Sequence, residues 1–441
     1  MTKGRAPDVV AHADAVVVGA GPGGSAAAYF LAQAGHDVVL LEKETFPRDK
    51  VCGDGLTPRA VRALATLGLE AEARGEPAGW ARQEGLRMYG GGVVLDLPWP
   101  DLPDWPAHSV TATRALFDHT LARNAEKAGA QVWEGCEVTG PVYLTSSEAR
   151  VAGVAYRRGD AGHGVVRAPV VIVADGGSSR FGVALGLHRN RARPLGVAVR
   201  AYYRSPRAQM QMMEGFLEMR TKGSGVGAAG APGRGGAVGD LLPGYGWIFP
   251  LDDGLVNVGW GLLGSSEAFR ATNYRKTLDE WIASFPPEWE IDPTTQVGKA
   301  RSAGLPMGHN RKPAVHKGAM LIGDAAGMVN SFNGEGISYA IEAAELACEA
   351  ADAALRARSD APLQAYPSAV GAAWGGYYTL GNLFAQIMAN PEIMRFCVTH
   401  GMPRRGLMQF VFRTMAHLVD RPSADATDRL LNTLSRAVPA A

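Results

Sequence analysis

The sequence is poor in cysteine, in long apolar runs and in net charge. Its 441 residues contain only four cysteines, whose spacing suits neither a disulfide framework nor a zinc site. No apolar run is long enough to span a bilayer. The formal net charge of +1 provides no field to attract nucleic acid, and the aromatic residues are not interleaved with a basic stripe. These features argue against disulfide-rich, zinc-binding, membrane-spanning and nucleic-acid-binding proteins.

Other signatures of function and targeting are also missing. No GxSxG pattern occurs, and the ten histidines show no HExxH spacing, so hydrolase and metalloenzyme functions are not favoured. The N-terminal segment begins polar and lacks the apolar core and cleavage site of a signal peptide. We therefore expect a cytoplasmic protein without a metal ion. A chain of this length with 46% apolar residues predicts two or three domains.

Residues 15–42 predict a strand, a glycine turn, an alanine-rich helix and a second strand. Gly19 permits the tight turn, Gly21 lets the backbone approach a pyrophosphate, and Gly24 lets helix and strand pack closely. Glu42 ends the second strand, where an acid can accept hydrogen bonds from a ribose 2′-hydroxyl. The complete order of strand, helix, strand and acid favours dinucleotide binding over an accidental turn.

The bare GxGxxG spacing recurs at 225–230 and 259–264, which shows how weak that pattern is alone. The first copy lies in the glycine-rich run 223–239, which we expect to be a flexible loop. The second copy follows a strand but has no later strand ending in an acid. Neither copy is predicted to bind a nucleotide.

Two later segments repeat the pattern of a strand followed by an acid. One runs into Asp175, and the other, AMLIGDAAG, runs into Gly323 and Asp324. A helix predicted to start near Gly336 and Ile337 would aim its N-terminal amides at a bound cofactor. For either aspartate alone, a helix N-cap or a turn is the simpler interpretation.

Together with the first glycine turn, these segments resemble the flavoprotein hydroxylase superfamily. The resemblance implies FAD, not NAD, with Asp324 at the ribityl chain and the helix at 336–337 facing the flavin pyrimidine edge. It also implies that Arg114, early in an amphipathic helix, approaches the FAD phosphate or ribose. A surface ion pair is an equally good interpretation of Arg114. Val138, at the end of the following short strand, is implied to touch adenine through its backbone.

The stretch GYGWIFPLDDGLVNVGWG, residues 244–261, concentrates aromatic rings on a predicted strand. Trp247 and Phe249 share one face of that strand because side chains alternate along it, and Tyr245 precedes them. An ordinary aromatic core strand is the alternative interpretation. Such a strand does not require Pro250 or the glycines of the final GWG, whereas a strand bent over a flavin uses both to end pairing and to admit a ring closely.

The loop FPRDKVCGDG, residues 46–55, places Cys52 in a proline- and glycine-rich setting. With the YxWxFP pattern and the later GxG, it resembles the geranylgeranyl reductase family. Within that family the chain is most similar to the actinobacterial branch that saturates a double bond in the menaquinone isoprenyl tail. The resemblance spans roughly residues 12–345 and implies that the cysteine loop lies beside the isoalloxazine, with the aromatic segment facing it across the substrate cavity.

The resemblance also implies an architecture: a Rossmann-type FAD-binding domain, an inserted sheet-based substrate domain and a helical C-terminal tail. We expect the FAD-binding domain at 1–79, 109–185 and 301–352, the substrate domain at 80–108 and 186–300, and the helical tail at 353–441. These boundaries are predictions from pattern alone.

The expected site follows from these segments taken with the resemblance. Cofactor binding is predicted for Gly19, Gly21, Pro22, Gly23, Gly24, Glu42, Lys43, Gly53, Asp54, Arg114, Val138, Asp175, Gly323, Asp324, Gly336 and Ile337. Substrate binding is predicted for Tyr245, Trp247 and Phe249, and catalysis for Cys52, Tyr245 and Trp247.

The implied reaction is saturation of an isoprenoid carbon–carbon double bond by hydride from reduced flavin. An isoprenoid alkene is unpolarised, so it must accept a proton and develop carbocation character as hydride arrives. The ring faces of Tyr245 and Trp247 can stabilise that charge by roughly 1 to 2 kcal/mol when desolvated. Cys52 could donate the proton, tune the flavin or only pack, and a cation such as the nearby Lys50 would lower its pKa.

Several alternatives stay open at this stage. A flavin-dependent monooxygenase or halogenase of the same fold is the alternative function, because YGWIFP partly matches the halogenase pattern WxWxIP. The electron donor is open among NAD(P)H, ferredoxin and a quinone-linked donor, so a redox partner is one alternative. The methionine- and aromatic-rich tail contains Arg395, Arg404, Arg405 and Arg413. It predicts either a packed helical cap or an interfacial surface on the inner face of the membrane that admits a hydrophobic isoprenoid.

Overall fold

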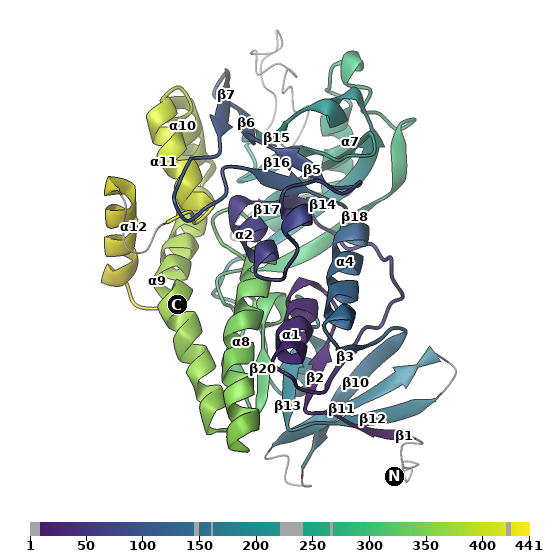
Figure 1. Cartoon of the computed structure of the whole chain (residues 1–441). Helices are drawn as coiled ribbons and strands as arrows, with labels where there is room; N and C mark the ends of the chain where they lie inside the picture. Colours follow the sequence, from purple (N-terminus) through teal and green to yellow (C-terminus); the bar gives the residue numbers. More distant parts are fainter. Residues whose placement is uncertain (1–8, 145–149, 160–161, 221–240, 265–267, 420–424) are drawn as a thin grey trace.

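The computed structural model describes residues 9–144, 150–159, 162–220, 241–264, 268–419 and 425–441. The glycine-rich run 223–239, which we expected to be a flexible loop, lies outside these residues. The described chain forms four sheets with helices around them, and its C-terminal helices lie along one side of the molecule (Figure 1).

A six-stranded sheet forms around the first glycine turn, in the order β19-β20-β13-β2-β3-β9. All its strands run parallel except the edge strand β19. The strands are β2 (Ala15–Val18), β3 (Val38–Leu41), β9 (Gln131–Trp133), β13 (Val170–Val173), β19 (Val315–His316) and β20 (Ala319–Leu321). The central three, β2, β3 and β13, are fully buried runs of Val, Ile, Leu and Ala, as a parallel sheet covered on both faces requires.

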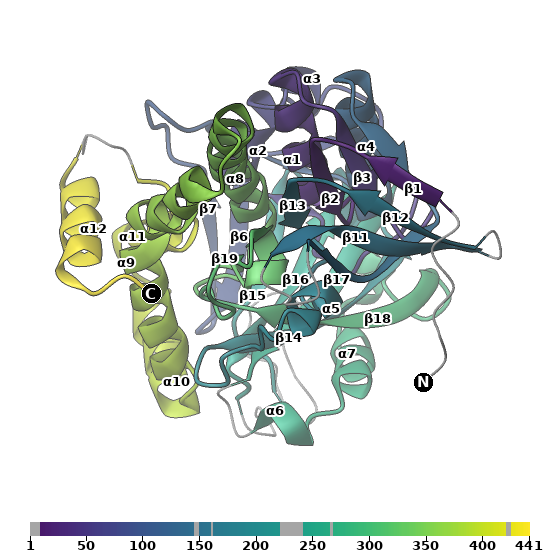
Figure 2. The ribbon, with the colours of Figure 1, turned by 90° about the horizontal axis from the view of Figure 1, so that it is seen from below.

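Helices cover one face of this sheet and a second sheet covers the other (Figure 2). The helices are α1 (Pro22–Gln33), α4 (Arg114–Lys127) and α8 (Ile337–Ala357). The second sheet has the order β1-β12-β11-β10, formed by β1 (Val9–His12), β10 (Cys136–Tyr143), β11 (Val151–Arg158) and β12 (His163–Arg167). Side chains of both sheets and all three helices belong to one hydrophobic core.

A seven-stranded sheet, in the order β18-β14-β17-β16-β15-β6-β7, forms the other large layer. Its neighbours are antiparallel except β15 and β6, which run parallel. The strands are β6 (Gly85–Gly90), β7 (Val93–Pro98), β14 (Leu195–Arg204), β15 (Met212–Phe216), β16 (Gly244–Pro250), β17 (Leu255–Leu263) and β18 (Gln296–Pro306). One face packs on α7 (Tyr274–Ile282), with Trp260 and Trp281 at the centre of that core. The aromatic strand β16 is therefore internal to a sheet.

Short elements connect the two large layers. A three-stranded sheet has the order β4-β8-β5 and brings the cysteine loop against the start of α4. The elements are β4 (Gly55–Leu56), α2 (Pro58–Ala65), α3 (Glu70–Ala73), β5 (Ala81–Gln83), β8 (Ser109–Thr111), α5 (Arg180–Ala184) and α6 (Ala268–Ala271).

The C-terminal region is helical. It contains α9 (Ala365–Met388), α10 (Pro391–Gly401), α11 (Arg405–Met415) and α12 (Ala426–Ala437). Helix α9 lies along α8, while α10 and α11 lie beside β6 and β7 (Figure 1). None of the described helices is both long and apolar enough to cross a membrane. Of the arginines considered for an interface, Arg413 is not available, because it is buried and pairs with Asp425 and Asp428.

The expected combination of a Rossmann-type domain, an inserted sheet and a helical C-terminal region is confirmed. The expected boundaries after residues 300 and 352 fall inside β18 and α8, so both elements continue across them. The division into domains stays a prediction.

Candidate active site

One large cavity lies between the six-stranded sheet, the seven-stranded sheet and the C-terminal helices. Its volume is about 1620 Å³, and it extends from the glycine turn, between the cysteine loop and β16, to the helices α10 and α11. The wall at the glycine turn is formed by Gly19, Gly21, Pro22, Gly23, Glu42, Lys43, Val138 and Asp175. The wall at the C-terminal end is apolar and includes Met394, Met402, Met408 and Phe412. The cavity therefore has a polar end and an apolar end.

The glycine turn at the polar end is tightly packed on one side and open on the other. Gly19 has a φ of +92°, and a Cβ there would lie 2.7 Å from the carbonyl oxygen of Ala174. A Cβ at Gly24 would lie 1.8 Å from the carbonyl oxygen of Gly19. Gly21 lines the cavity, and a Cβ there would meet nothing within 4 Å. Helix α1 begins without a side-chain cap or an acid in its first turn, so its free amides suit an anion.

A buried ion-pair network lies beside this turn. Glu42 accepts hydrogen bonds from the amide of Ala20 at 2.9 Å and from Arg48 at 3.1 Å. Arg48 also donates to Asp118 at 2.6 Å, and Asp118 accepts two bonds from Arg114, each at 2.8 Å. The surface ion pair considered for Arg114 is wrong, since the pair is buried within α4. Arg114 nevertheless lines the cavity.

The two later aspartates both lie at the cavity, at the carboxyl ends of β13 and β20. Asp175 accepts a hydrogen bond from the amide of Phe181 at 2.9 Å, while its Oδ1 is buried without a partner among the described residues. Burial raises the pKa of Asp175 and of Asp324. The charge of Lys50 opposes this shift at Asp324. Close by, α8 begins at Ile337 after Gly336, again without a side-chain cap.

The cysteine loop is fastened to the large sheet by polar side chains. Asn257, on β17, donates to the carbonyl oxygen of Cys52 and to Asp54 Oδ2, both at 2.8 Å, and accepts from Trp247 Nε1 at 2.9 Å. Arg200, on β14, pairs with Asp49 at the start of the loop. These contacts position Cys52 on the cavity wall opposite β18.

Asp54 differs from its expected role, because its side chain points away from the cavity and does not line it. Its backbone φ is +65°, and its buried carboxylate accepts from Tyr202 at 2.7 Å as well as from Asn257. Burial raises the pKa of Asp54 to about 6, against the effect of both hydrogen bonds. Asp54 therefore fastens the cysteine loop to the seven-stranded sheet, on the side of the loop away from the cavity.

The Cys52 thiol does line the cavity. Burial raises its pKa above the ordinary value of 9.0, and the charge of Arg114 partly offsets that shift. The cation beside Cys52 is thus Arg114, where the sequence suggested Lys50. At neutral pH the thiol keeps its proton.

On β16 the three expected aromatic side chains all line the cavity: Tyr245, Trp247 and Phe249. The ring centroids of Tyr245 and Trp247 are 5.9 Å apart, and those of Trp247 and Phe249 are 6.2 Å apart. The Tyr245 hydroxyl donates to the carbonyl oxygen of Asn333 at 2.6 Å, and burial raises its pKa to about 12. A Cβ at Gly53 would lie 3.1 Å from Phe249, so the cysteine loop approaches this aromatic face closely.

The glycines of the GWG pattern do not end strand pairing. Gly259 and Gly261 lie within β17 and are paired with both β14 and β16. A Cβ at Gly259 would lie 2.3 Å from the Trp247 indole. The ring that Gly259 admits is therefore the protein's own tryptophan, which corrects the expectation of a flavin ring there.

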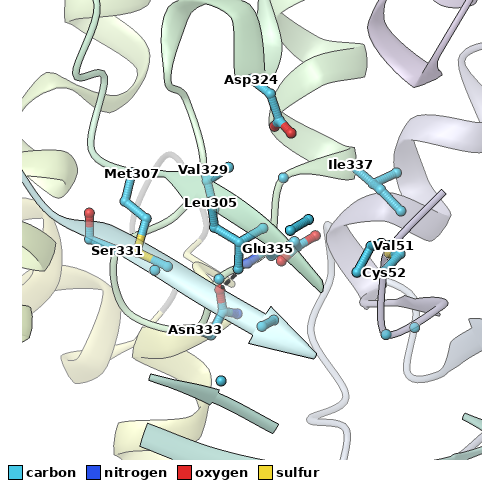
Figure 3. A pocket seen from close by; sticks show the side chains of 18 of the residues that line it. Val51, Cys52, Leu305, Met307, Asp324, Val329, Ser331, Asn333, Glu335 and Ile337 are labelled. Atoms are coloured by element: carbon cyan, nitrogen blue, oxygen red, sulfur yellow. Dashed lines mark hydrogen bonds between the residues drawn. The ribbon is translucent and has the colours of Figure 1, made fainter. Parts of the chain in front are cut away.

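The remaining wall comes from β18 and from the segment before α8 (Figure 3). In that view Leu305 and Met307 lie on one side of the pocket, Cys52 and Ile337 lie on the other, and Glu335 lies between the two sides. Leu305, Met307 and Ile337 make this part of the wall apolar, whereas Glu335 brings a carboxyl group to it.

Comparison with known proteins places this site in a family. The FAD binding domain family model matches residues 12–372. The chain is 35% identical to the menaquinone reductase of Mycolicibacterium smegmatis over 433 residues, covering 97% of each protein. It is 31% identical to a digeranylgeranylglycerophospholipid reductase of Methanopyrus kandleri over 345 residues, covering 77% of this chain and 80% of the relative. The chain belongs to the geranylgeranyl reductase family of FAD-binding proteins.

A solved structure supports the fold of this FAD-dependent oxidoreductase. The geranylgeranyl bacteriochlorophyll reductase-like protein of Thermoplasma acidophilum matches with a TM-score of 0.72 and 22% identity. The match covers 96% of this chain and 100% of that protein. The predicted family, fold class and FAD cofactor are thus confirmed.

The polar end of the cavity fits FAD. Open amides at α1 suit a pyrophosphate, and the uncapped start of α8 suits the pyrimidine edge of a flavin. The unpartnered Oδ1 of Asp175 is available as a hydrogen-bond acceptor. Val138 lies within β10 and not at the end of β9, which differs from expectation, whereas Lys43 borders the cavity as expected with a largely exposed side chain. The roles of individual residues toward FAD stay predictions.

Several residues at this site were missed from the sequence. Arg48 lies inside the cysteine loop 46–55, and Asn257 lies inside the aromatic stretch 244–261. Asn257 is a polar residue within an otherwise apolar strand, and this pattern could have identified it from the sequence. Glu335 adjoins the predicted helix start and carries no comparable signal. The apolar wall from α10 and α11 could be identified only once those helices were placed against β6 and β7.

Proposed function

We propose that this FAD-dependent oxidoreductase saturates a carbon–carbon double bond in an isoprenoid chain, with the menaquinone side chain as the favoured substrate. The observation that carries the proposal is the continuous cavity, whose polar end suits FAD and whose apolar end suits a branched hydrocarbon. The name of the mycolicibacterial relative, a menaquinone reductase similar over 97% of the chain, supports the choice of substrate.

When bound, FAD supplies the hydride in its reduced form. The protein's own contribution is to hold the alkene, to exclude water and to stabilise developing positive charge. Tyr245 and Trp247 line the cavity, and an aromatic ring face turned toward a carbocation-like centre is worth roughly 1 to 2 kcal/mol when desolvated. Cys52 and Phe249 line the cavity beside Tyr245 and Trp247.

The apolar end of the cavity also suggests where the substrate comes from. Phe396 on α10 and Leu407 on α11 both line the cavity, yet they are 64% and 47% exposed. Arg404 and Arg405 lie exposed beside them. An apolar rim with neighbouring arginines suits an anionic membrane surface. We therefore include peripheral membrane contact in the proposal, with the isoprenoid passing from the bilayer between α10 and α11.

The test is anaerobic incubation of dithionite-reduced protein with menaquinone or with geranylgeranyl diphosphate, followed by mass spectrometry. A product heavier by two hydrogens supports the reductase. Oxygenated or halogenated product formed only under air identifies the alternative monooxygenase or halogenase. Replacing dithionite with NAD(P)H or reduced ferredoxin in the same assay identifies the electron donor.

A matched pair of variants tests the aromatic wall. Trp247→Leu removes the ring but leaves an apolar side chain, whereas Trp247→Phe keeps a ring face. We expect the leucine variant to reduce the alkene roughly 5- to 30-fold more slowly than the phenylalanine variant, from the loss of about 1 to 2 kcal/mol. Equal rates in two variants that both retain FAD would remove the aromatic wall from the proposal.

A further inference from the structure

Glu335 is a carboxyl group on the cavity wall that the chemistry above does not use. It lies two residues before Ile337, the first residue of α8 (Figure 3), and it lines the same cavity as Tyr245. Its Oε1 accepts hydrogen bonds from Thr57 Oγ1 at 2.7 Å and from Ser338 Oγ at 2.6 Å. Its Oε2 is buried and has no hydrogen-bond partner in the described part of the chain. The two hydroxyl groups thus fix the orientation of the carboxyl group while satisfying only one of its oxygens.

This arrangement favours the neutral acid. An ionised carboxylate would leave a charged, buried Oε2 without a donor, which is costly in an apolar setting. Burial raises the pKa of Glu335, and the hydrogen bonds from Ser338 and Thr57 only partly oppose the shift. A proton carried on Oε2 removes the uncompensated charge.

The charged and titratable groups around Glu335 do not force its carboxyl group to ionise. Arg59, on α2, lowers the pKa of Glu335, but its guanidinium donates to Glu342 at 2.6 Å, and the charge of Glu342 acts in the opposite direction. Three tyrosines interact with Glu335 from β16, α8 and α9, and burial raises the pKa of each, so all three are neutral: Tyr245, Tyr339 and Tyr377.

Asp324 is a second carboxyl group on the cavity wall whose pKa burial raises, whereas the other two proton-bearing groups near Glu335, Cys52 and Tyr245, are weaker acids. The pKa of Cys52 is raised above 9.0, and that of Tyr245 to about 12. Burial makes the thiol and the phenol weaker acids than usual, so a carboxylic acid held at this wall is a better general acid than either.

We propose that Glu335 holds, as a neutral acid, the proton that reduction of the isoprenoid double bond consumes. This inference rests on the proposed function. The π bond is lost and two C–H bonds form, one with hydride from the reduced flavin and one with the proton from Glu335 Oε2, whose O–H bond breaks. The remaining carboxylate is stabilised by Thr57, Ser338 and the charge of Arg59, and water returns the proton before the next turnover.

The kinetic test uses pre-reduced, FAD-loaded protein in single-turnover reduction of menaquinone across a range of pH. Glu335→Gln keeps the acceptor for Thr57 and Ser338 but has no acidic proton. We expect it to slow alkene reduction by about 10²- to 10⁴-fold, with FAD content and substrate affinity unchanged, and to abolish the limb of the pH profile at which wild-type activity falls as pH rises. Glu335→Asp should restore that limb. Glu349→Gln, on the exposed face of α8, is the matched control and should behave as wild type.

A second test needs neither cofactor nor substrate. Infrared spectra of FAD-free wild-type protein at neutral pH should contain the carbonyl stretch of a protonated carboxylic acid. This band should shift in D2O and should be missing from the spectrum of Glu335→Gln. Wild-type rates in the glutamine variant, or no such band in wild-type protein, would overturn the role of Glu335. A band present in protein that reduces no isoprenoid would instead overturn the proposed function on which the role rests.

Discussion

Substituting Gly259 tests the packing that positions Trp247. A Cβ at Gly259 would lie 2.3 Å from Trp247 Cζ2 and 2.6 Å from the carbonyl oxygen of Val199 on the neighbouring strand. Both distances are too short for a carbon atom, and one of the two neighbours is backbone. The indole is buried and hydrogen-bonded to Asn257, so it cannot move aside freely. Gly259→Ala must therefore displace either β14 or the indole.

The size of the effect follows from three contributions. Overpacking of a core costs about 1 to 3 kcal/mol. Loss of the hydrogen bond from Trp247 to Asn257 adds about 0.5 to 1.5 kcal/mol. Alanine recovers about 0.5 to 1 kcal/mol because it restricts the unfolded chain more than glycine does. We expect the free energy of unfolding of Gly259→Ala to fall by about 2 kcal/mol, within a range of about 0.5 to 4 kcal/mol, measured by urea unfolding with tryptophan fluorescence.

Gly261, two residues later on the same strand, provides the control. Its nearest neighbours to an added Cβ are the carbonyl oxygen of Val197 at 3.3 Å and Ala198 Cβ at 3.6 Å. Gly261→Ala should stay within about 0.5 kcal/mol of wild type. Equal stability of the two variants would refute the argument that Gly259 is small in order to seat the Trp247 indole.

Three further predictions concern charge, cofactor and membrane. Burial raises the pKa of Asp54 to about 6, so the folded protein holds the proton of the Asp54 carboxyl group more tightly than the unfolded chain does. The folded protein therefore loses stability as the pH rises from about 4 to 6. In Asp54→Asn this loss, at most about 3 kcal/mol, should disappear from the pH dependence of urea unfolding. Arg48→Met should weaken FAD binding roughly 10- to 100-fold in fluorescence titrations, because a partly buried cation on the cavity wall is removed. Phe396→Ser combined with Leu407→Ser should reduce sedimentation with anionic vesicles, whereas Leu434→Ser on α12 should not; unchanged sedimentation would contradict the membrane contact.

The parts of the fold that sequence predicted were encoded locally. The glycine turn at 19–24, the strand–acid segment at Asp324 and the helix start at Ile337 each combine a buried strand or a helix with a special terminal residue. Such segments depend on their own backbone geometry, and they also carried the family resemblance. Period-two alternation likewise predicted one face for Trp247 and Phe249 of β16, and both line the cavity.

The parts that sequence did not predict depend on contacts between distant segments. Asp54 was predicted to bind the cofactor, but its carboxylate accepts hydrogen bonds from Tyr202 and Asn257, and its backbone has a positive φ. Arg413 looked like an interfacial arginine until α12 placed Asp428 against it. In both cases the direction of one side chain is set by a partner on another element, and spacing along the chain does not contain that direction.

The polar contacts behind the cavity wall explain how an apolar site can be held rigidly. Asn257 joins the cysteine loop to the aromatic strand, and the Tyr245 hydroxyl joins that strand to Asn333. Thr57, which lies two residues after the cysteine loop, then donates a hydrogen bond to Glu335, two residues beyond Asn333. Three distant segments thus form a closed ring of hydrogen bonds around one pocket. A hydrocarbon chain offers no polar group by which to organise the site, so the protein must organise the site in advance, through hydrogen bonds between its own segments that hold the apolar side chains on the cavity wall.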